Sequence, residues 1–266
     1  MNWIEVNGTA LRYEVSGEGA CPLVLVHEMG GTLESWDRVM PALLPGRRVL
    51  RHDWRGAGQS EKLAAPVTFQ TMAGDIAALL DAVGITGRVA LAGCAVGAGI
   101  ALTFAGLYPA RAAAVVAMAP ATGMAAERRA GMLERVAQTE ALGMAAVVEE
   151  SFAASYPPEV RHDAAAYREF RARWLANDPR SYANIYRMLI HAELADVLAA
   201  IACPVLALAG TLDRLRPPAV VAPIAAAIPG ARFMPVESGH FMAVQTPDVV
   251  AAAINGFLRP LEREAI

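Results

Sequence analysis

The sequence contains a single lysine, Lys62, and few charged residues of any kind. Charged residues make up 18% of its 266 residues, aromatic residues make up 6%, and the formal net charge is −3 with an isoelectric point near 6.0. Proteins that bind nucleic acid or an anionic membrane usually present a strongly basic face, so these values argue against both partners. Apolar residues make up 55% of the chain, which is ample material for a large hydrophobic core.

Cysteines and long apolar runs are also scarce. The three cysteines, Cys21, Cys94 and Cys203, are an odd number in apolar contexts, which favours buried thiols in a reducing cytoplasm. The first residues lack a basic segment followed by an apolar run, so no secretory signal is expected. The most apolar stretch, residues 112–119, is too short to span a bilayer. We expect a cytoplasmic protein without a membrane or nucleic-acid partner; a homo-oligomer is compatible with the sequence.

Short apolar runs alternate with helical patterns along most of the chain. Leu23–Val26 is a continuous apolar run, as expected for a strand buried on both faces of a parallel sheet. The other predicted strands are 3–6, 11–14, 48–52, 89–93, 113–118, 205–210 and 232–236. The predicted helices are 36–44, 71–83, 97–108, 218–228 and 247–258. This alternation indicates an α/β fold with a mostly parallel central sheet flanked by helices.

One region breaks the alternation. Residues 122–194 show helical segments and no convincing strand, with interruptions at Tyr156-Pro157-Pro158 and Asn177-Asp178-Pro179. Ligands bind at the carboxyl edge of the sheet in open α/β folds, so we interpret this insertion after the sixth strand as a helical lid over that edge. The core would then comprise residues 1–121 and 195–266.

The sequence Gly93-Cys94-Ala95-Val96-Gly97 lies between a predicted strand and a predicted helix. Small residues two positions before and after a central residue permit the sharp turn called a nucleophile elbow. Such a turn exposes its central residue at a helix N-terminus, whose free N–H groups favour negative charge. That residue is normally a nucleophile, but here it is Ala95. Cys94 does not replace it, because it lies one position off the centre of the turn.

A glycine-containing loop, His27-Glu28-Met29-Gly30-Gly31, follows the strand Leu23–Val26. Neighbouring parallel strands end at the same edge of a sheet, so this loop should lie beside the elbow. We expect the backbone N–H of Met29 and that of Val96 to meet across a negatively charged oxygen. These two groups form the candidate oxyanion hole.

Two later turns supply a candidate acid and a candidate base. Gly210-Thr211-Leu212-Asp213 follows one predicted strand, and Ser238-Gly239-His240-Phe241 follows the next. The order of elbow, acid and histidine along the chain is the order found in hydrolases. The sequence shows no metal-ligand cluster and no phosphate-binding loop, so we expect neither a metal nor an organic cofactor.

Taken together, these motifs resemble the α/β-hydrolase superfamily, and within it the 3-oxoadipate enol-lactonases and similar small-substrate hydrolases. The motifs that carry the resemblance are Leu25-Val26-His27-x-x-Gly30-Gly31, Glu34-Ser35-Trp36-Asp37, Asp53-x-Arg55-Gly56-x-Gly58-x-Ser60, the elbow, Arg173–Pro179 and the Asp213 and His240 turns. The resemblance implies hydrolysis of a small ester, lactone or enamine/amide-like substrate, with His240 as general base and Asp213 as its orienting acid. Two residues depart from the pattern: Ala95 replaces the serine, and Glu28 replaces a glycine.

Ala95 has three interpretations. In the first, alanine is an engineered replacement for the serine of an enol-lactonase-like hydrolase. In the second, the chain is a catalytically silent relative that binds a ligand or partner. In the third, the natural enzyme has no nucleophile, and His240 activates a water directly; aminoacrylate hydrolases of pyrimidine degradation are similar and carry alanine at this position. Glu28 favours the third, because two changes in one small volume indicate a site retuned together. A carboxylate there is a candidate second acid/base on the water.

The predicted lid supplies candidate substrate contacts. Trp174 and Tyr186 suit either the lid's own core or a substrate wall. The lid arginines Arg171, Arg173 and Arg187 suit a carboxylate-bearing substrate if one of them faces the cleft. Of these three, Arg173 lies in the segment that carries the family resemblance.

Overall fold

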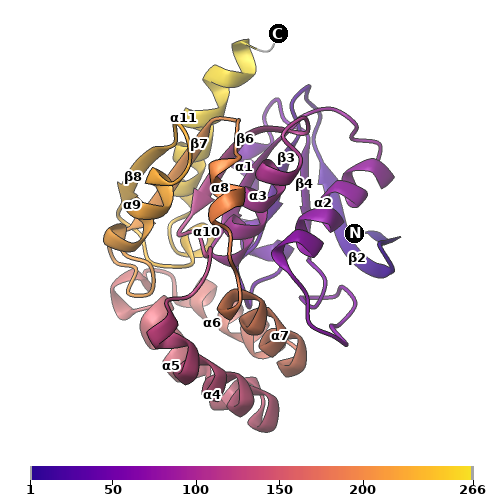
Figure 1. Cartoon of the computed structure of the whole chain (residues 1–266). Coiled ribbons are helices and arrows are strands. Elements are labelled where there is room, and N and C mark those ends of the chain that lie inside the picture. Colours follow the sequence, from indigo (N-terminus) through magenta and orange to yellow (C-terminus); the bar gives the residue numbers. More distant parts are fainter. Residues whose placement is uncertain (1, 265–266) are drawn as a thin grey trace.

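An eight-stranded sheet forms the centre of the molecule (Figure 1). The computed structural model describes residues 2–264. The strands are β1 (Asn2–Val6), β2 (Thr9–Ser16), β3 (Leu23–Val26), β4 (Val49–His52), β5 (Val89–Cys94), β6 (Ala112–Met118), β7 (Val205–Gly210) and β8 (Arg232–Val236). Their spatial order is β1-β2-β4-β3-β5-β6-β7-β8. The β1–β2 and β2–β4 pairs are antiparallel and the others are parallel, which confirms the predicted mostly parallel sheet.

The central strands are buried on both faces, because helices cover each side of the sheet. Every residue of β3, β5 and β7 is buried, which explains their uninterrupted apolar sequences. Helices α2 (Phe69–Ala82) and α3 (Val96–Leu107) pack on one face. Helices α1 (Met40–Leu43) and α11 (Pro247–Glu264) pack on the other. The remaining core helices are η1 (Leu33–Trp36), α8 (Ala195–Ala199), α9 (Pro218–Ala226) and α10 (Met242–Gln245).

The single helix predicted over residues 36–44 is wrong. The chain forms the short 3-10 helix η1, and α1 begins only at Met40. Pro41 lies in the first turn of α1, where its missing N–H breaks no helical hydrogen bond; further inside a longer helix it would remove one. No helix among residues 2–264 is long and apolar enough to cross a membrane.

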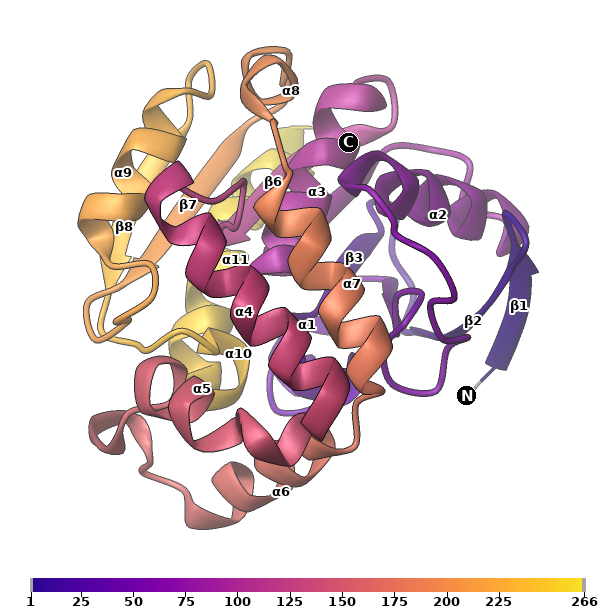
Figure 2. The same cartoon turned by 60° about the horizontal axis from the view of Figure 1, so that its bottom comes forward.

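The lid inserted after β6 lies at one end of the sheet (Figure 1). It consists of α4 (Ala126–Leu142), η2 (Met144–Ala146), α5 (Val148–Ser155), η3 (Pro158–Val160), α6 (Ala164–Leu175) and α7 (Pro179–Ile190). Helices α4 and α7 run side by side across this end (Figure 2). The helical lid after the sixth strand is thus confirmed, while its proposed limits at residues 122 and 194 stay a prediction.

Aromatic side chains attach the lid to the core. Phe152 of α5 packs against lid aromatics and against Phe241 of the core, with ring centroids 5.5 Å from Trp174 and 6.2 Å from Phe241. Gln245 of α10 adds a polar contact, because its side-chain amide donates to the carbonyl of Ser155 at 2.9 Å. Since Phe241 directly follows His240, the lid packs on the turn that carries the candidate base.

Candidate active site

The turn between β5 and α3 has the strained backbone of a nucleophile elbow. Ala95 has φ 51° and ψ −115°, a conformation that non-glycine residues rarely adopt. The neighbouring glycines are required by close packing: a Cβ on Gly97 would lie 2.2 Å from the carbonyl oxygen of His27, and one on Gly93 would lie 2.4 Å from that of Gly97. The chain therefore maintains the elbow geometry even though its central side chain is a methyl group.

Asp213 and His240 form a buried pair. The Nδ1 atom of His240 lies 2.8 Å from Oδ2 of Asp213, while Oδ1 accepts the backbone N–H groups of Leu215 and Arg216 at 2.8 and 3.0 Å. Burial alone would raise the pKa of Asp213, but the charge and hydrogen bond of His240 and these two N–H groups outweigh it, so this pKa is lowered. Asp213 is thus held ionised and orients the imidazole, leaving Nε2 for a substrate or water.

A cavity of about 550 Å³ lies between the lid and the carboxyl ends of the strands. Its core-side lining includes the elbow and the two turns already described: Met29, Ala95, Val96, Ala121, Leu215, Arg216, His240 and Phe241. Its lid-side lining includes Met124, Arg128, Met132, Arg135, Ser151, Trp174, Tyr182, Tyr186 and Leu189. This volume and its mostly apolar walls with a few polar groups are typical of a small-molecule site. No cluster of three potential metal ligands occurs among residues 2–264.

The loop after β3 brings Met29 to the cavity and turns Glu28 away from it. The N–H of Gly31 donates to the carbonyl of Glu28 at 3.0 Å, and Gly30 has φ 84°, as at the third residue of a type II turn. Met29, which lies between Glu28 and Gly30, lines the cavity together with Val96, the first residue of α3. The first N–H groups of a helix have no acceptor within it, so the Val96 N–H is available to a ligand.

Glu28 does not lie where the sequence led us to expect. Its side chain is fully buried and is not among the residues that line the cavity. Its Oε1 accepts the hydroxyl hydrogen of Ser35 at 2.6 Å, and its Oε2 has no hydrogen-bond partner among the described residues. The carboxylate therefore packs beneath the loop, which argues against direct contact with a catalytic water.

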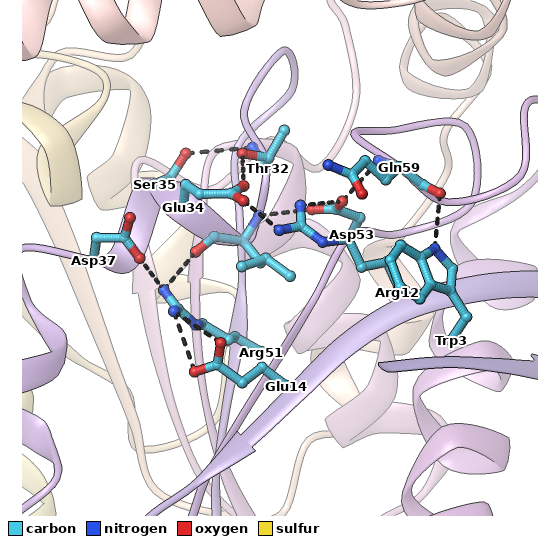
Figure 3. A network of polar contacts seen from close by, with 11 residues as sticks. Trp3, Arg12, Glu14, Thr32, Glu34, Ser35, Asp37, Arg51, Asp53 and Gln59 are labelled. Carbon is cyan, nitrogen blue, oxygen red and sulfur yellow. Dashed lines mark hydrogen bonds and ion pairs between the residues drawn. The ribbon is translucent and has the colours of Figure 1, made fainter. Parts of the chain in front are cut away.

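A buried polar network fixes the segment that follows this loop (Figure 3). Asp53, just after β4, accepts the backbone N–H of Leu33 at 2.7 Å and that of Gln59 at 2.8 Å. Its Oδ2 also pairs with the guanidinium of Arg12 at 3.1 Å, and Arg12 in turn pairs with Glu34. Hydrogen bonds to these charged groups tie β2 and β4 to the beginning of η1. The loop that carries Met29 is thus anchored at its far end.

The lid candidates divide into two groups. Trp174 and Tyr186 line the cavity, and Trp174 packs so closely on Gly30 that a Cβ there would lie 2.3 Å from its ring. Arg173 does not line the cavity. The other two arginines pair with lid glutamates: Arg171 with Glu149 at 2.5 Å and Arg187 with Glu140 at 2.5 Å.

Three other arginines line the cavity instead, and sequence reasoning missed them. Arg128 and Arg135 lie on α4 with Met132 between them, at positions i, i+7 and i+4. That spacing places them on one helix face, and it could have identified the face of α4 that covers the cavity. Arg216 follows Asp213 by three residues and has no such signal in the sequence.

The chain is similar to known hydrolases over its length. It is 30% identical to the predicted carbamate hydrolase RutD of Azorhizobium caulinodans over 262 residues, covering 95% of this chain and 96% of that protein. A solved enol-lactonase from Burkholderia xenovorans superposes with a TM-score of 0.90 at 26% identity, covering 97% and 100% of the two chains.

A third similarity covers only part of a longer protein. The dihydrolipoyllysine-residue acetyltransferase component of the acetoin cleaving system of Pseudomonas putida is 41% identical over 118 residues, which are 44% of this chain and 32% of that protein. The family model for the alpha/beta hydrolase fold matches residues 22–247, a span that contains the elbow, the lid, Asp213 and His240. The chain therefore belongs to the alpha/beta hydrolase fold family.

Proposed function

We propose that the protein hydrolyses a small ester, lactone or enamine/amide-like substrate by direct attack of water. The observation that carries this proposal is the His240–Asp213 pair, intact and facing the same cavity as an elbow that has no nucleophile. The similarity to an enol-lactonase and to a predicted carbamate hydrolase supports a carbonyl compound as the substrate.

The proposed reaction uses the chain's own groups in named roles. With an ester, lactone or amide, a water beside Ala95 transfers a proton to Nε2 of His240 as its oxygen bonds to the substrate carbonyl carbon. The negative charge that develops on the carbonyl oxygen is stabilised by the N–H groups of Met29 and Val96. His240 then returns the proton to the leaving group as the bond to the carbonyl carbon breaks. Asp213 stays ionised and stabilises the imidazolium.

Two alternatives stay in competition with this mechanism. In an engineered serine-to-alanine form, the same pair would be idle until the serine is restored. In a silent relative, nothing would select for a buried carboxylate aligned on a histidine that faces the cavity. Burying that carboxylate is costly unless its hydrogen bonds are kept, so its retention favours catalysis.

Replacement of Ala95 by serine separates the alternatives. We would screen the wild type and Ala95→Ser against enol-lactones, aryl esters and enamines, with His240→Ala as the matched loss-of-base control. The proposal expects turnover by the wild type without a burst, unchanged or lower activity in Ala95→Ser, and a loss of on the order of 10²- to 10⁴-fold in His240→Ala. An inactive wild type with strong gain and an acyl-enzyme burst in Ala95→Ser would establish the engineered alternative. Inactivity of both would support the silent one.

A further inference from the structure

Arg216 is a cavity-lining cation that has no carboxylate partner among the residues that the structure describes. It is half-buried, and its Nη1 donates to the backbone carbonyl of Pro120 at 3.2 Å. No ion pair joins its guanidinium to any carboxylate in the described part of the chain. The nearby Asp213 carboxylate is already occupied by His240 and by two backbone N–H groups. Most of the five N–H groups of the guanidinium therefore have no protein acceptor.

The other two cavity arginines differ from Arg216 in this respect. Arg135 is neutralised by Glu150 at 2.6 Å and also donates to the hydroxyl of Ser151 at 2.6 Å. Arg128 is exposed to solvent, which hydrates its charge. Arg216 alone of the three combines partial burial with the lack of an ion-pair partner.

The pKa of Arg216 also reflects the lack of a carboxylate partner among the described residues. The pKa of Arg216 is lowered to about 10, because burial and the charge of Arg128 lower it by more than Asp213 and Tyr186 raise it. The guanidinium is nevertheless charged at neutral pH. A partly desolvated cation is stabilised when an anion binds it through hydrogen bonds, and a carboxylate fits the planar guanidinium fork with two parallel bonds.

The backbone fixes Arg216 relative to the reacting centre. Its N–H donates to Oδ1 of Asp213 at 3.0 Å, so one short turn holds both the acid that orients His240 and the unpaired guanidinium. An anionic group bound by Arg216 would therefore place the rest of the molecule in the cavity that His240 and Ala95 line. A cavity of about 550 Å³ suits a short molecule with its acyl group near Ala95.

We propose that Arg216 binds a carboxylate of the substrate and thereby selects short acyl compounds that carry a second, ionised carboxyl group. This inference rests on the proposed function, because it places the selected carbonyl group at the His240 site. Arg216 replaces the lid arginines Arg171, Arg173 and Arg187 as the anion-binding residue, since none of those three lines the cavity.

The test measures binding rather than turnover, so it does not depend on the catalytic mechanism. The probes are oxo-carboxylates of four to eight carbons, for example 5-oxohexanoate, each paired with its neutral amide, here 5-oxohexanamide. The ketone group of each probe cannot be hydrolysed, and an assay for released ammonia checks that the amide probe stays intact during the titration. The two members of a pair differ in charge but hardly in shape. Titration calorimetry at pH 7.5 would compare the wild type, Arg216→Gln and Arg216→Lys. Arg214→Gln is the matched control, because Arg214 lies in the same turn, is exposed and pairs with Glu159 at 3.1 Å.

We expect at least one carboxylate to bind the wild type and Arg214→Gln tightly, and to bind Arg216→Gln on the order of 10- to 100-fold more weakly. Affinity for the neutral amide should change less than threefold, and Arg216→Lys should recover part of the preference. The proposal is overturned if no carboxylate binds the wild type better than its amide, or if Arg216→Gln weakens both probes equally. A charge preference in a protein that never turns over would instead contradict the proposed function alone.

Discussion

Replacing Asp213 by asparagine separates the orienting role of this carboxylate from its structural role. Oδ1 of Asp213 accepts two backbone N–H groups, and an asparagine oxygen in the same place can accept both. The side-chain NH₂ must then face Nδ1 of His240, 2.8 Å away in the wild type. That nitrogen has to become the acceptor, so the imidazole proton moves to Nε2 and the base is lost.

The magnitudes follow from these contacts. Asp213→Asn exchanges the carboxylate's charge-assisted hydrogen bonds to His240 and to two backbone N–H groups for neutral ones, and it should lower the free energy of unfolding by about 1–2 kcal/mol. Asp213→Ala removes the acceptor of two part-buried backbone N–H groups and the partner of the His240 imidazole, and it should cost about 2–6 kcal/mol. Hydrolysis should fall on the order of 10²- to 10⁴-fold in both variants.

The dependence of the free energy of unfolding on pH in the acid range provides a further test. Because the pKa of Asp213 is lowered in the folded protein, its stabilisation is present above the unfolded pKa of about 3.9 and is lost as the pH falls through the folded value. Asp213→Asn should lack this acid-dependent component.

Three measurements would check this prediction. Urea unfolding gives the stability of both variants, nitrogen-15 NMR of the imidazole gives the tautomer, and steady-state kinetics on a substrate of the wild type gives the rate. The reasoning is refuted if His240 keeps its proton on Nδ1 in the Asp213→Asn variant, or if the asparagine and alanine variants are equally stable.

Three further predictions concern the elbow, the loop network and the lid. Gly97→Ala should destabilise the protein by more than about 3 kcal/mol, because its Cβ would meet two carbonyl oxygens at 2.2 and 2.3 Å. The control Gly131→Ala lies in open space within α4 and should stabilise the protein by about 0.5–1 kcal/mol. Equal shifts of the melting temperature in the two variants would contradict the packing argument. Burial opposes ionisation of Glu34, but its bonds to Arg12 and Thr32 lower its pKa to about 2. The wild type should therefore be more stable than Glu34→Gln by up to about 3 kcal/mol above pH 4.5, and this difference should disappear as the pH falls toward 2. A difference that does not change with pH in denaturant titrations would exclude this. Phe152→Ala should lower the free energy of unfolding by about 3–5 kcal/mol, measured in urea, whereas a loss below 1 kcal/mol would show that the lid cluster contributes little.

The strands and the elbow were predictable because local sequence determines them. Leu23–Val26 and Val205–Gly210 are apolar on both faces only if they are central strands, and the structure has both with those bounds. The glycines around Ala95 likewise have one steric explanation. The apolar runs and the glycine spacing can be read from a few neighbouring residues, although the carbonyl oxygens that exclude a Cβ at Gly97 belong to Val26 and His27.

The direction of single side chains was not predictable in the same way. Glu28 was expected to face the elbow, but the turn at Gly30 and the hydroxyl of Ser35 direct its carboxylate beneath the loop. The lid arginines Arg171, Arg173 and Arg187 were the candidates for binding a carboxylate, whereas Arg216 borders the cavity. Which arginine faces the cavity depends on the packing of the lid on the sheet, which involves residues more than a hundred positions apart.

The contact between Phe152 and Phe241 has a consequence for the order in which the chain can assemble. During synthesis the lid leaves the ribosome before β7, β8 and the segment that follows them, and domains begin to fold as they emerge. Until Phe241 is made, the rings of Phe152, Tyr156 and Phe170 can pack on one another, but they lack the Phe241 ring that all three also contact in the finished molecule. One side of the lid's aromatic cluster therefore stays uncovered until the turn after β8 has been made. The turn after β8 supplies both His240, the partner of Asp213, and Phe241, on which the lid packs, so a chain truncated before His240 loses both contacts together.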